Sequence, residues 1–374
     1  MQRIKHIFRL GQKELWSLWR DPMMLILIVY SFTVAIYIAA TAIPATLHNA
    51  PIGIVDEDHS PLSARIAAAF YPPDFTHPKM ISLQEMDSGM DNGEFTFTLV
   101  IPPEFQRDVL AAKQPEIQLN IDATRMSQAF MGNNHIQQIV LGEVNDFIRR
   151  YRNISELPVA LTLRARFNPS LEQSWFGSIV EIINVVTMLS IILTGAALIR
   201  EREHGTIEHL LVMPVTPGEI MISKIWSMGL VVLAATGISL VLIVHTLLKV
   251  PMEGSVFLFL SGSILYLFAM TSLGIYLATL ARTMPQFGLL LMLTLIPLNV
   301  LSGGLTPRES MPLLVQNLML FAPTTYYVEI GQAILFRGAG LDIVWKPFAS
   351  LLLSGSVLFA LSLKRFRKTI SLVS

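Results

Sequence analysis

The sequence predicts an α-helical polytopic membrane protein with six transmembrane helices and an α/β domain inserted on its outer, periplasmic side. Three observations predict this class. Apolar residues make up 52% of the 374 residues and charged residues only 14%, whereas a soluble domain carries about 25% charged residues. Six long apolar segments recur along the chain. Residues 44–174 instead hold 10 basic and 16 acidic residues, and therefore form a polar insert.

The first 43 residues combine an amphipathic segment with an apolar one. Residues 1–22 place apolar side chains at helical spacing between basic ones, which is typical of a helix lying at the membrane surface. The apolar positions are Ile4, Ile7, Phe8, Leu15, Leu18 and Trp19. We expect a cytoplasmic elbow helix there, with a mere topology signal as the alternative. Residues 23–43 carry no charge and exceed the apolar length of a cleaved signal peptide, so they predict the first transmembrane helix.

The insert, residues 44–174, alternates strand-like and helix-like stretches, which predicts a compact α/β domain. Short strands are expected at Ile52–Asp56, Thr96–Ile101 and Ile117–Ile121, and helices at Pro61–Phe70, Pro103–Ala112 and about Gln128–Arg150. The acidic run Asp56-Glu57-Asp58 closes the first strand. It is compatible with a cation site, but a solvated turn is the simpler interpretation, because no other carboxylates can be placed beside it.

The remaining five spans follow the insert. Residues 175–199 form the second, and four more lie within residues 225–363. These four are expected at Ile225–Leu248, Val256–Leu280, Gln286–Leu301 and Pro347–Leu363. Pro297 interrupts the fifth span, which is therefore expected to be bent or broken. Within residues 302–346, the stretch Thr306–Tyr327 is apolar but contains three prolines, which predicts an outer re-entrant or interfacial helical hairpin.

The basic residues determine the expected orientation. Lys and Arg gather in residues 1–22, in the loops after the second and fourth spans, and in the tail, residues 364–374. With six spans, all of these segments fall on one side, which the positive-inside rule assigns to the cytoplasm. Both termini are therefore expected in the cytoplasm, and residues 44–174 and 302–346 outside.

The chain shows no motif for chemistry of its own. It has no cysteine and no Gly-x-x-x-x-Gly-Lys-Ser/Thr phosphate loop. His204 and His209 are five residues apart, about 140° around a helix, so they are poorly placed to share a metal ion. No segment combines the basic and aromatic residues that favour nucleic acid. We therefore expect no catalytic residue, no cofactor, no metal site and no nucleic-acid partner.

Two polar residues stand out in the second span. Glu181 lies beside Asn184, and Asn299 lies in the fifth span. Ionisable groups inside a bilayer are costly and are functional candidates by default. These three residues are therefore candidates for a substrate path, although Glu181 is close enough to the span's end to be an interfacial carboxylate.

The loop of residues 200–224 is dense in helix-capping signals. Gly205 permits a turn, Thr206 can cap a short helix at Ile207–Met213, and Pro214 ends that helix. Thr216-Pro217-Gly218-Glu219 has the form of a capping box that starts the next helix. A short helix with acidic and apolar side chains, held off the membrane, suits docking into a groove of a soluble partner. An ordinary connector is the alternative.

This loop resembles that of the permease subunits of type-two ABC exporters, particularly the drug-efflux branch. The matching residues are Glu201, Arg202, Glu203, Gly205, Thr206, Glu208, Leu210, Pro214 and Lys224. A second matching stretch covers Leu301–Pro312 and Phe321–Glu329, and the six-span plan with a large outer domain also matches. Ser223 departs from the Gly common in relatives. In that family the loop forms the coupling helix that contacts the ATPase.

The resemblance implies a transmembrane permease that exports an amphipathic or lipophilic, drug-like substrate across a bacterial inner membrane. A separately encoded ATPase subunit would bind ATP and dock through Glu201, Glu203 and Glu208. A second permease copy or a sister permease would complete the path, and a periplasmic adaptor is a further expected partner. The alternatives are an ion-coupled secondary carrier, a membrane-anchored receptor or scaffold, and a relative that transmits mechanical signals without transport.

Overall fold

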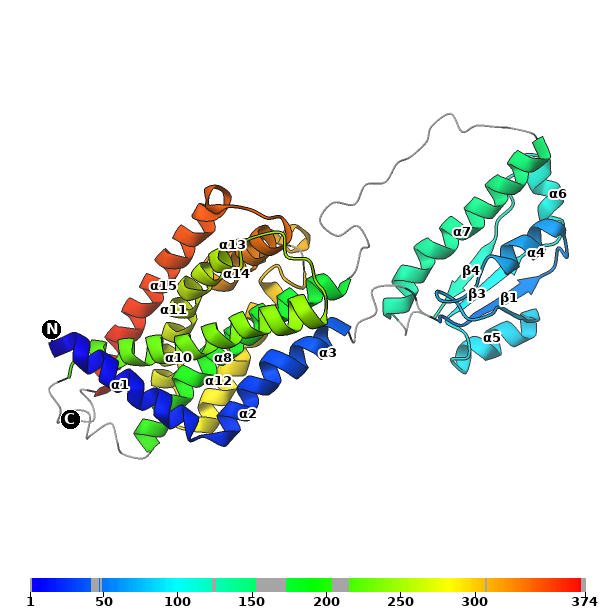
Figure 1. Ribbon diagram of the computed structural model, residues 1–374. Coiled ribbons are helices and arrows are strands. Elements are labelled where there is room, and N and C mark those ends of the chain that lie inside the picture. Colours follow the sequence, from blue (N-terminus) through cyan, green and yellow to red (C-terminus); the bar gives the residue numbers. More distant parts are fainter. Residues whose placement is uncertain are drawn as a thin grey trace. The chain divides into compact units, whose positions relative to one another are not determined.

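The chain forms two units, each with its own hydrophobic core, in a computed structural model (Figure 1). One unit comprises residues 1–43 and 165–374, and the other comprises residues 44–164. The structure describes residues 2–41, 47, 49–122, 126–152, 173–203, 215–306 and 308–370.

The larger unit is a bundle of helices. Its N-terminal part holds α1 (Gln2–Trp19), α2 (Pro22–Tyr30), the π-helical segment η1 (Ser31–Ala35) and α3 (Ile36–Thr41). The rest holds α8 (Gln173–Glu203), α10 (Pro217–Ser239) continued by η2 (Leu240–Leu247), α11 (Val256–Leu280), α12 (Met284–Leu301), η3 (Arg308–Ser310), α13 (Leu313–Met319), α14 (Pro323–Gly331), η4 (Gln332–Phe336) and α15 (Leu341–Ile370). Six of the described helical stretches are long and apolar enough to cross a membrane, which confirms the predicted six-span class.

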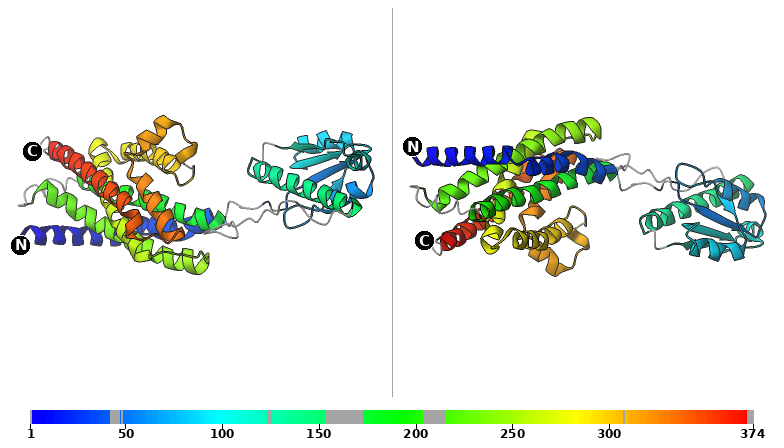
Figure 2. Two further views of the ribbon diagram at one scale, coloured as in Figure 1. Left: turned by 90° about the horizontal axis from the view of Figure 1, so that it is seen from above. Right: turned by 90° about the horizontal axis from the view of Figure 1, so that it is seen from below.

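The long helix α8 is the centre of this bundle. Of its most apolar 18 residues, 83% are buried, whereas the corresponding shares are 22% for α15 and 17% for α12. Figure 2 shows α8 among the other long helices in two views. The outward faces of α12 and α15 present large apolar side chains such as Leu293 and Leu353. Lipid or another membrane subunit must cover these faces.

Helices α8 and α15 extend beyond the membrane spans expected for them, and α12 differs at its proline. Helix α8 continues to Glu203, and α15 begins at Leu341 and runs through Pro347. Helix α12 is continuous across Pro297, so of the two expected alternatives, bent or broken, the broken span is excluded. A proline removes one backbone hydrogen bond, and neighbouring helices can compensate for that loss in a membrane helix.

The segment between α12 and α15 contains the expected helical hairpin. Helices α13 and α14 follow each other and η4 continues α14, so the hairpin reaches Phe336. Pro312 is the N-cap of α13 and Pro323 is the first residue of α14. The prolines thus start these helices rather than break them, since the first turn needs no backbone N–H donor.

The smaller unit is a four-stranded sheet with helices. The strands are β1 (Ile52–Asp56), β2 (Lys79–Met80), β3 (Phe97–Ile101) and β4 (Gln118–Ile121), and the helices are α4 (Pro61–Ala68), α5 (Leu83–Asp91), α6 (Phe105–Leu110) and α7 (Met126–Arg152). Their order in the sheet is β2-β1-β3-β4, with β1 parallel to both neighbours and β3 antiparallel to β4. Gly53 pairs with Thr98, and Leu99 with Leu119.

Two elements of this unit escaped sequence analysis. Strand β2 has only two residues, both exposed, and thus no hydrophobic alternation to detect. Helix α5 mixes apolar and polar residues around Gly89. Its capping box, in which Ser82 and Glu85 bond each other's backbone, was the available signal. The Ser82 backbone N–H and hydroxyl both donate to the Glu85 carboxylate, and these bonds hold the pKa of that carboxyl below its usual value.

Candidate functional site

The candidate site is the base of the loop of residues 200–224, where α8 ends and α10 begins. We call the last turn of α8, the first turns of α10 and the part of α1 packed on them the loop base. The tip of the loop lies outside the described residues. It includes five predicted contact residues, namely Gly205, Thr206, Glu208, Leu210 and Pro214, and the expected helix Ile207–Met213.

The capping box predicted at the start of α10 is present. The Thr216 hydroxyl accepts the Glu219 backbone N–H at 3.3 Å, and the Glu219 carboxylate accepts the Thr216 backbone N–H at 2.6 Å. Pro217 occupies the first helical position. These contacts satisfy N–H groups that the first turn leaves free, so they set where the chain leaves the loop and enters the span.

Four charged side chains meet at the loop base, and we call them the charge cluster: Lys13, Glu14, Glu201 and Lys224. Lys224 Nζ lies 2.8 Å from a carboxylate oxygen of Glu14 and 2.8 Å from one of Glu201. Lys13 Nζ lies 2.8 Å from the other oxygen of Glu201. The cluster therefore joins α1 to both stems of the loop, and its two acids balance its two bases.

The cluster differs from a surface network in its burial. The Lys224 side chain is 1% exposed, Glu14 is 8% and Glu201 is 10%, whereas Lys13 is 51%. Burial raises the pKa of the Glu14 carboxyl, and the adjacent Lys224 ammonium opposes that shift. Taking charges out of water is costly unless each has a partner, so separating these helices would expose or isolate buried charges.

Helix α1 also packs directly on α10 beside the cluster. The Trp226 indole N–H donates to the Ile7 carbonyl at 3.3 Å, and its ring stacks on Phe8 with 5.6 Å between centroids. Gly11 makes room for that ring, because a Cβ atom there would lie 2.1 Å from a Trp226 carbon. The predicted elbow helix is thus packed against this chain's own third span.

The last turn of α8 is tied to three further helices. Arg202 donates to the carbonyls of Ala281 at 2.6 Å and Ala278 at 3.1 Å, at the end of α11. Glu203 accepts the backbone N–H of Met284 at 3.1 Å, in the first turn of α12. Arg200 forms an ion pair with Asp21 before α2. The end of α8 is therefore fixed to the ends of its neighbours.

The residues predicted to line a substrate path are only partly brought together. The Asn184 amide donates to the Glu181 carboxylate at 3.3 Å, and both lie half-buried on α8. Asn299 lies half-buried near the end of α12, and no hydrogen bond joins it to either of those side chains. Their part in transport stays a prediction.

The acidic run of the α/β unit organises a turn. Asp56 accepts the backbone N–H groups of Asp58 and His59, each at 3.0 Å, and the Ser63 hydroxyl at 2.8 Å. Asp58 accepts the Gln106 backbone N–H at 3.1 Å. These bonds link the end of β1 to the starts of α4 and α6, which supports the interpretation as a turn.

Sequence analysis missed Glu14 and the inward position of Glu201. Glu14 is the one acidic residue within α1, on an otherwise basic amphipathic helix. A lone carboxylate in such a helix was the available signal. What placed it beside Lys224, 210 positions later in the chain, was the packing of α1 on α10.

Known proteins are similar to this chain along almost its whole length. Residues 22–364 match the family described as ABC-2 family transporter protein. The inner membrane transport permease YhhJ of Escherichia coli K12 is 60% identical over 370 residues, covering 99% of each chain. The probable multidrug ABC transporter permease YbhR of the same strain is 28% identical over 365 residues, covering 95% of this chain and 97% of YbhR. The related YbhS is 25% identical over 365 residues, covering 93% and 92%.

Proposed function

Because this chain belongs to the ABC-2 family of transporter proteins and is an ABC transporter permease, we propose that it is the membrane half of an ATP-driven exporter. The six apolar helices and the inner-membrane relative support a multi-pass protein of the inner membrane. Family membership implies a partner ATPase. The positive-inside count supports cytoplasmic termini and, with them, a loop base on the proposed ATPase side.

The main support for this proposal is the set of contacts at the loop base. A coupling loop must pass a displacement of the ATPase to the spans, and a loosely attached loop would absorb it. Here Lys224 and Glu201 join both stems to α1, and Arg202 and Glu203 tie α8 to α11 and α12. A displacement of the loop would therefore reach α8, α10, α11 and α12 through ion pairs and hydrogen bonds.

We divide the predicted contact residues by their surroundings. The side chain of Glu201 is 10% exposed and engaged by two lysines, so we assign it to holding the loop rather than to touching the ATPase. Glu203 is exposed and caps α12. Glu208 and Leu210, at the loop tip, are the proposed ATPase contacts, with Gly205, Thr206 and Pro214 shaping the tip between them.

The bundle and the relatives support proposals for the substrate and for the other partners. The names of YbhR and YbhS, probable multidrug permeases, together with the apolar spans, support an amphipathic or lipophilic substrate. We propose that a second copy or a sister permease covers part of the apolar surface of the spans. Glu181, Asn184 and Asn299 are the proposed polar lining of the path. The α/β unit, in the periplasm, is proposed to meet an adaptor protein.

The test is copurification of the tagged full chain from membranes in mild detergent. We expect a phosphate-loop ATPase to copurify in stoichiometric amount with the unaltered chain. The double variant Glu208→Arg/Leu210→Asp should no longer bring the ATPase down. The matched control is Glu116→Arg, the same charge reversal at an exposed position of the α/β unit, which should retain the ATPase.

Two results would contradict the proposal. Absence of any ATPase with the unaltered chain would favour a secondary carrier or a scaffold. An ATPase that copurifies without ATP-dependent flux of amphipathic compounds in vesicles would favour a mechanical signalling device.

A further inference from the structure

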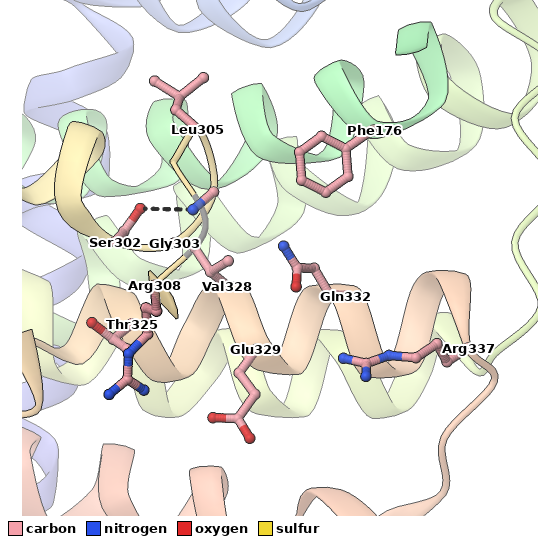
Figure 3. Close-up of a pocket in the computed structure, with 11 residues that line it drawn as sticks. Phe176, Ser302, Gly303, Leu305, Arg308, Thr325, Val328, Glu329, Gln332 and Arg337 are labelled. Atoms are coloured by element: carbon pink, nitrogen blue, oxygen red, sulfur yellow. Dashed lines mark hydrogen bonds between the residues drawn. The ribbon is translucent and has the colours of Figure 1, made fainter. Parts of the chain in front are cut away.

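A polar cavity of about 490 Å³ lies in the helical bundle, at the end where α8 begins (Figure 3). Three segments build it: the turn after α12, the face of α14 and η4, and the first turn of α8. Its lining combines charged and polar side chains with a few apolar ones: Arg308, Arg337, Glu329, Gln332, Thr325 and Phe176 among them. The loop base, by contrast, lies where α8 ends.

The cavity carries an excess of positive charge. Glu329 lies on α14, Arg337 lies at the end of η4 and Arg308 lies in η3, and all three line the cavity (Figure 3). Among the residues that the structure describes, none forms an ion pair with either arginine. Guanidinium groups stay charged at any physiological pH, and their planar donors match the two oxygens of a carboxylate or phosphate. Two arginines against one carboxylate leave a net charge of +1 for a ligand to neutralise.

The backbone shapes this site. The turn after α12 passes through Gly303 with a φ of +94°, a conformation that residues with a side chain rarely adopt. The Ser302 hydroxyl accepts the Gly304 backbone N–H at 3.4 Å within the same turn. This turn returns the chain over the cavity and brings Arg308 to its wall (Figure 3).

Part of the cavity lining is apolar. Phe176 of α8, Leu305 of the turn and Val328 of α14 line the cavity beside the charged groups. Phe176 and Leu305 are 39% and 60% exposed, so the apolar part of the lining is open to an incoming chain. A ligand with one anionic end and one apolar end would match both parts of the lining.

We propose that this cavity binds the anionic headgroup, a carboxylate or phosphate, of an amphipathic molecule. Arg308 and Arg337 hold the headgroup, and Phe176 and Leu305 contact the apolar part. This proposal rests on the proposed export function. In that function the cavity is a binding site near the outer end of the substrate path. The same chemistry would also accept the headgroup of an anionic membrane lipid.

The test measures binding to the full chain alone, without ATPase or ATP, in nanodiscs of phosphatidylcholine. The probes are a fluorescent long-chain fatty acid with a free carboxylate and its methyl ester, each corrected for binding to empty nanodiscs. We expect the acid to bind about tenfold more tightly than the ester, the gain typical of a charge-assisted contact. Arg308→Gln/Arg337→Gln should abolish that difference.

Two further variants separate loss of the site from loss of the fold. Lys346→Gln removes a positive charge at the same end of the bundle but outside the cavity, and should keep the difference. Glu329→Gln removes the negative charge and should tighten binding of the acid several-fold, a gain that an unfolded protein cannot show.

Repeating the measurement with phosphatidylglycerol in the nanodiscs identifies the source of the headgroup. Weaker probe binding would assign the site to resident lipid, and unchanged binding would assign it to substrate. Equal binding of acid and ester to the unaltered chain, or a difference that survives the double substitution, would overturn the proposal. Because no ATPase is present, either result is independent of the copurification test.

Discussion

The burial of Lys224 determines how strongly this residue stabilises the loop base. Lys224 ends the loop and Lys13 lies in the basic N-terminal segment, and both contact Glu201. They differ in exposure, 1% for the Lys224 side chain and 51% for Lys13. Loss of a buried partner leaves a carboxylate without compensation, while an exposed partner is replaced by water.

We therefore predict that Lys224→Met destabilises the protein far more than Lys13→Met. Breaking a buried pair costs about 3–5 kcal/mol, and an exposed pair contributes about 0–1 kcal/mol. The measurement is Tm of the purified chain in detergent. Adding Glu14→Leu to Lys224→Met should restore part of the loss, because Glu201 keeps Lys13. Equal Tm values for the two single variants would show that the cluster is not buried as described.

Some residues of the loop base were predicted from the sequence, but their partners within the chain were not. Glu201, Arg202 and Glu203 were singled out as contact residues, and all three lie at the loop base. Their partners were not foreseen, since Ala278, Met284 and Lys224 belong to helices that come together only on folding. A carboxylate in a loop motif looks the same in sequence whether it faces a partner protein or the chain's own lysine.

At the scale of the helices, close approach of α8 and α11 depends on Gly274. A Cβ atom at that position would lie 2.4 Å from the Thr194 hydroxyl and 2.7 Å from the Ile191 carbonyl oxygen. The carbonyl belongs to the backbone of α8, so it cannot rotate away. Small residues allow such contact between membrane helices, where packing rather than water drives association.

Gly274→Ala should therefore force α8 and α11 apart and lower stability by about 1–3 kcal/mol, the usual cost of overpacking. Gly288→Ala in α12 is the matched control, because no atom lies within 4 Å of the added Cβ. That change should be neutral or stabilising, since Ala favours a helix over Gly by about 1 kcal/mol. Comparison of the two Tm values checks this. A Gly274→Ala variant as stable as Gly288→Ala would contradict the described contact.

Helix starts were the most predictable part of the elements. Thr216 and Glu219 form the predicted capping box, because its bonds lie within four consecutive residues. The apolar part of α8 was expected to end at residue 199, where the basic residues lower the hydropathy, although the helix itself continues to Glu203. Polar residues end a hydrophobic pattern without ending a helix.

At the scale of the whole molecule, the α/β unit has a core of its own. Ile54, Phe97 and Ile136 are each at most 1% exposed and pack within residues 44–164. All neighbours of the four strands in the sheet belong to the same unit. Its fold therefore does not require the spans.

We predict that residues 44–164, produced without the helical bundle, form a soluble domain with a cooperative thermal transition by circular dichroism. Phe97→Asp places a charge in the buried core and should abolish that transition. The exposed control Glu116→Arg should leave it in place. A fragment that aggregates or melts without cooperativity would show that this unit depends on the bundle.

The sequence by itself determined the class of this protein, because span length, charge asymmetry and caps are properties of short stretches. About twenty consecutive apolar residues are long enough to span a membrane, and a capping box closes within four residues, so both signals are local. Only the tertiary structure decided that Glu201 faces Lys224, that Gly274 admits a neighbouring helix and that Arg308 and Arg337 share a cavity. These contacts join residues far apart in the chain, and the free energy of packing whole helices selects them.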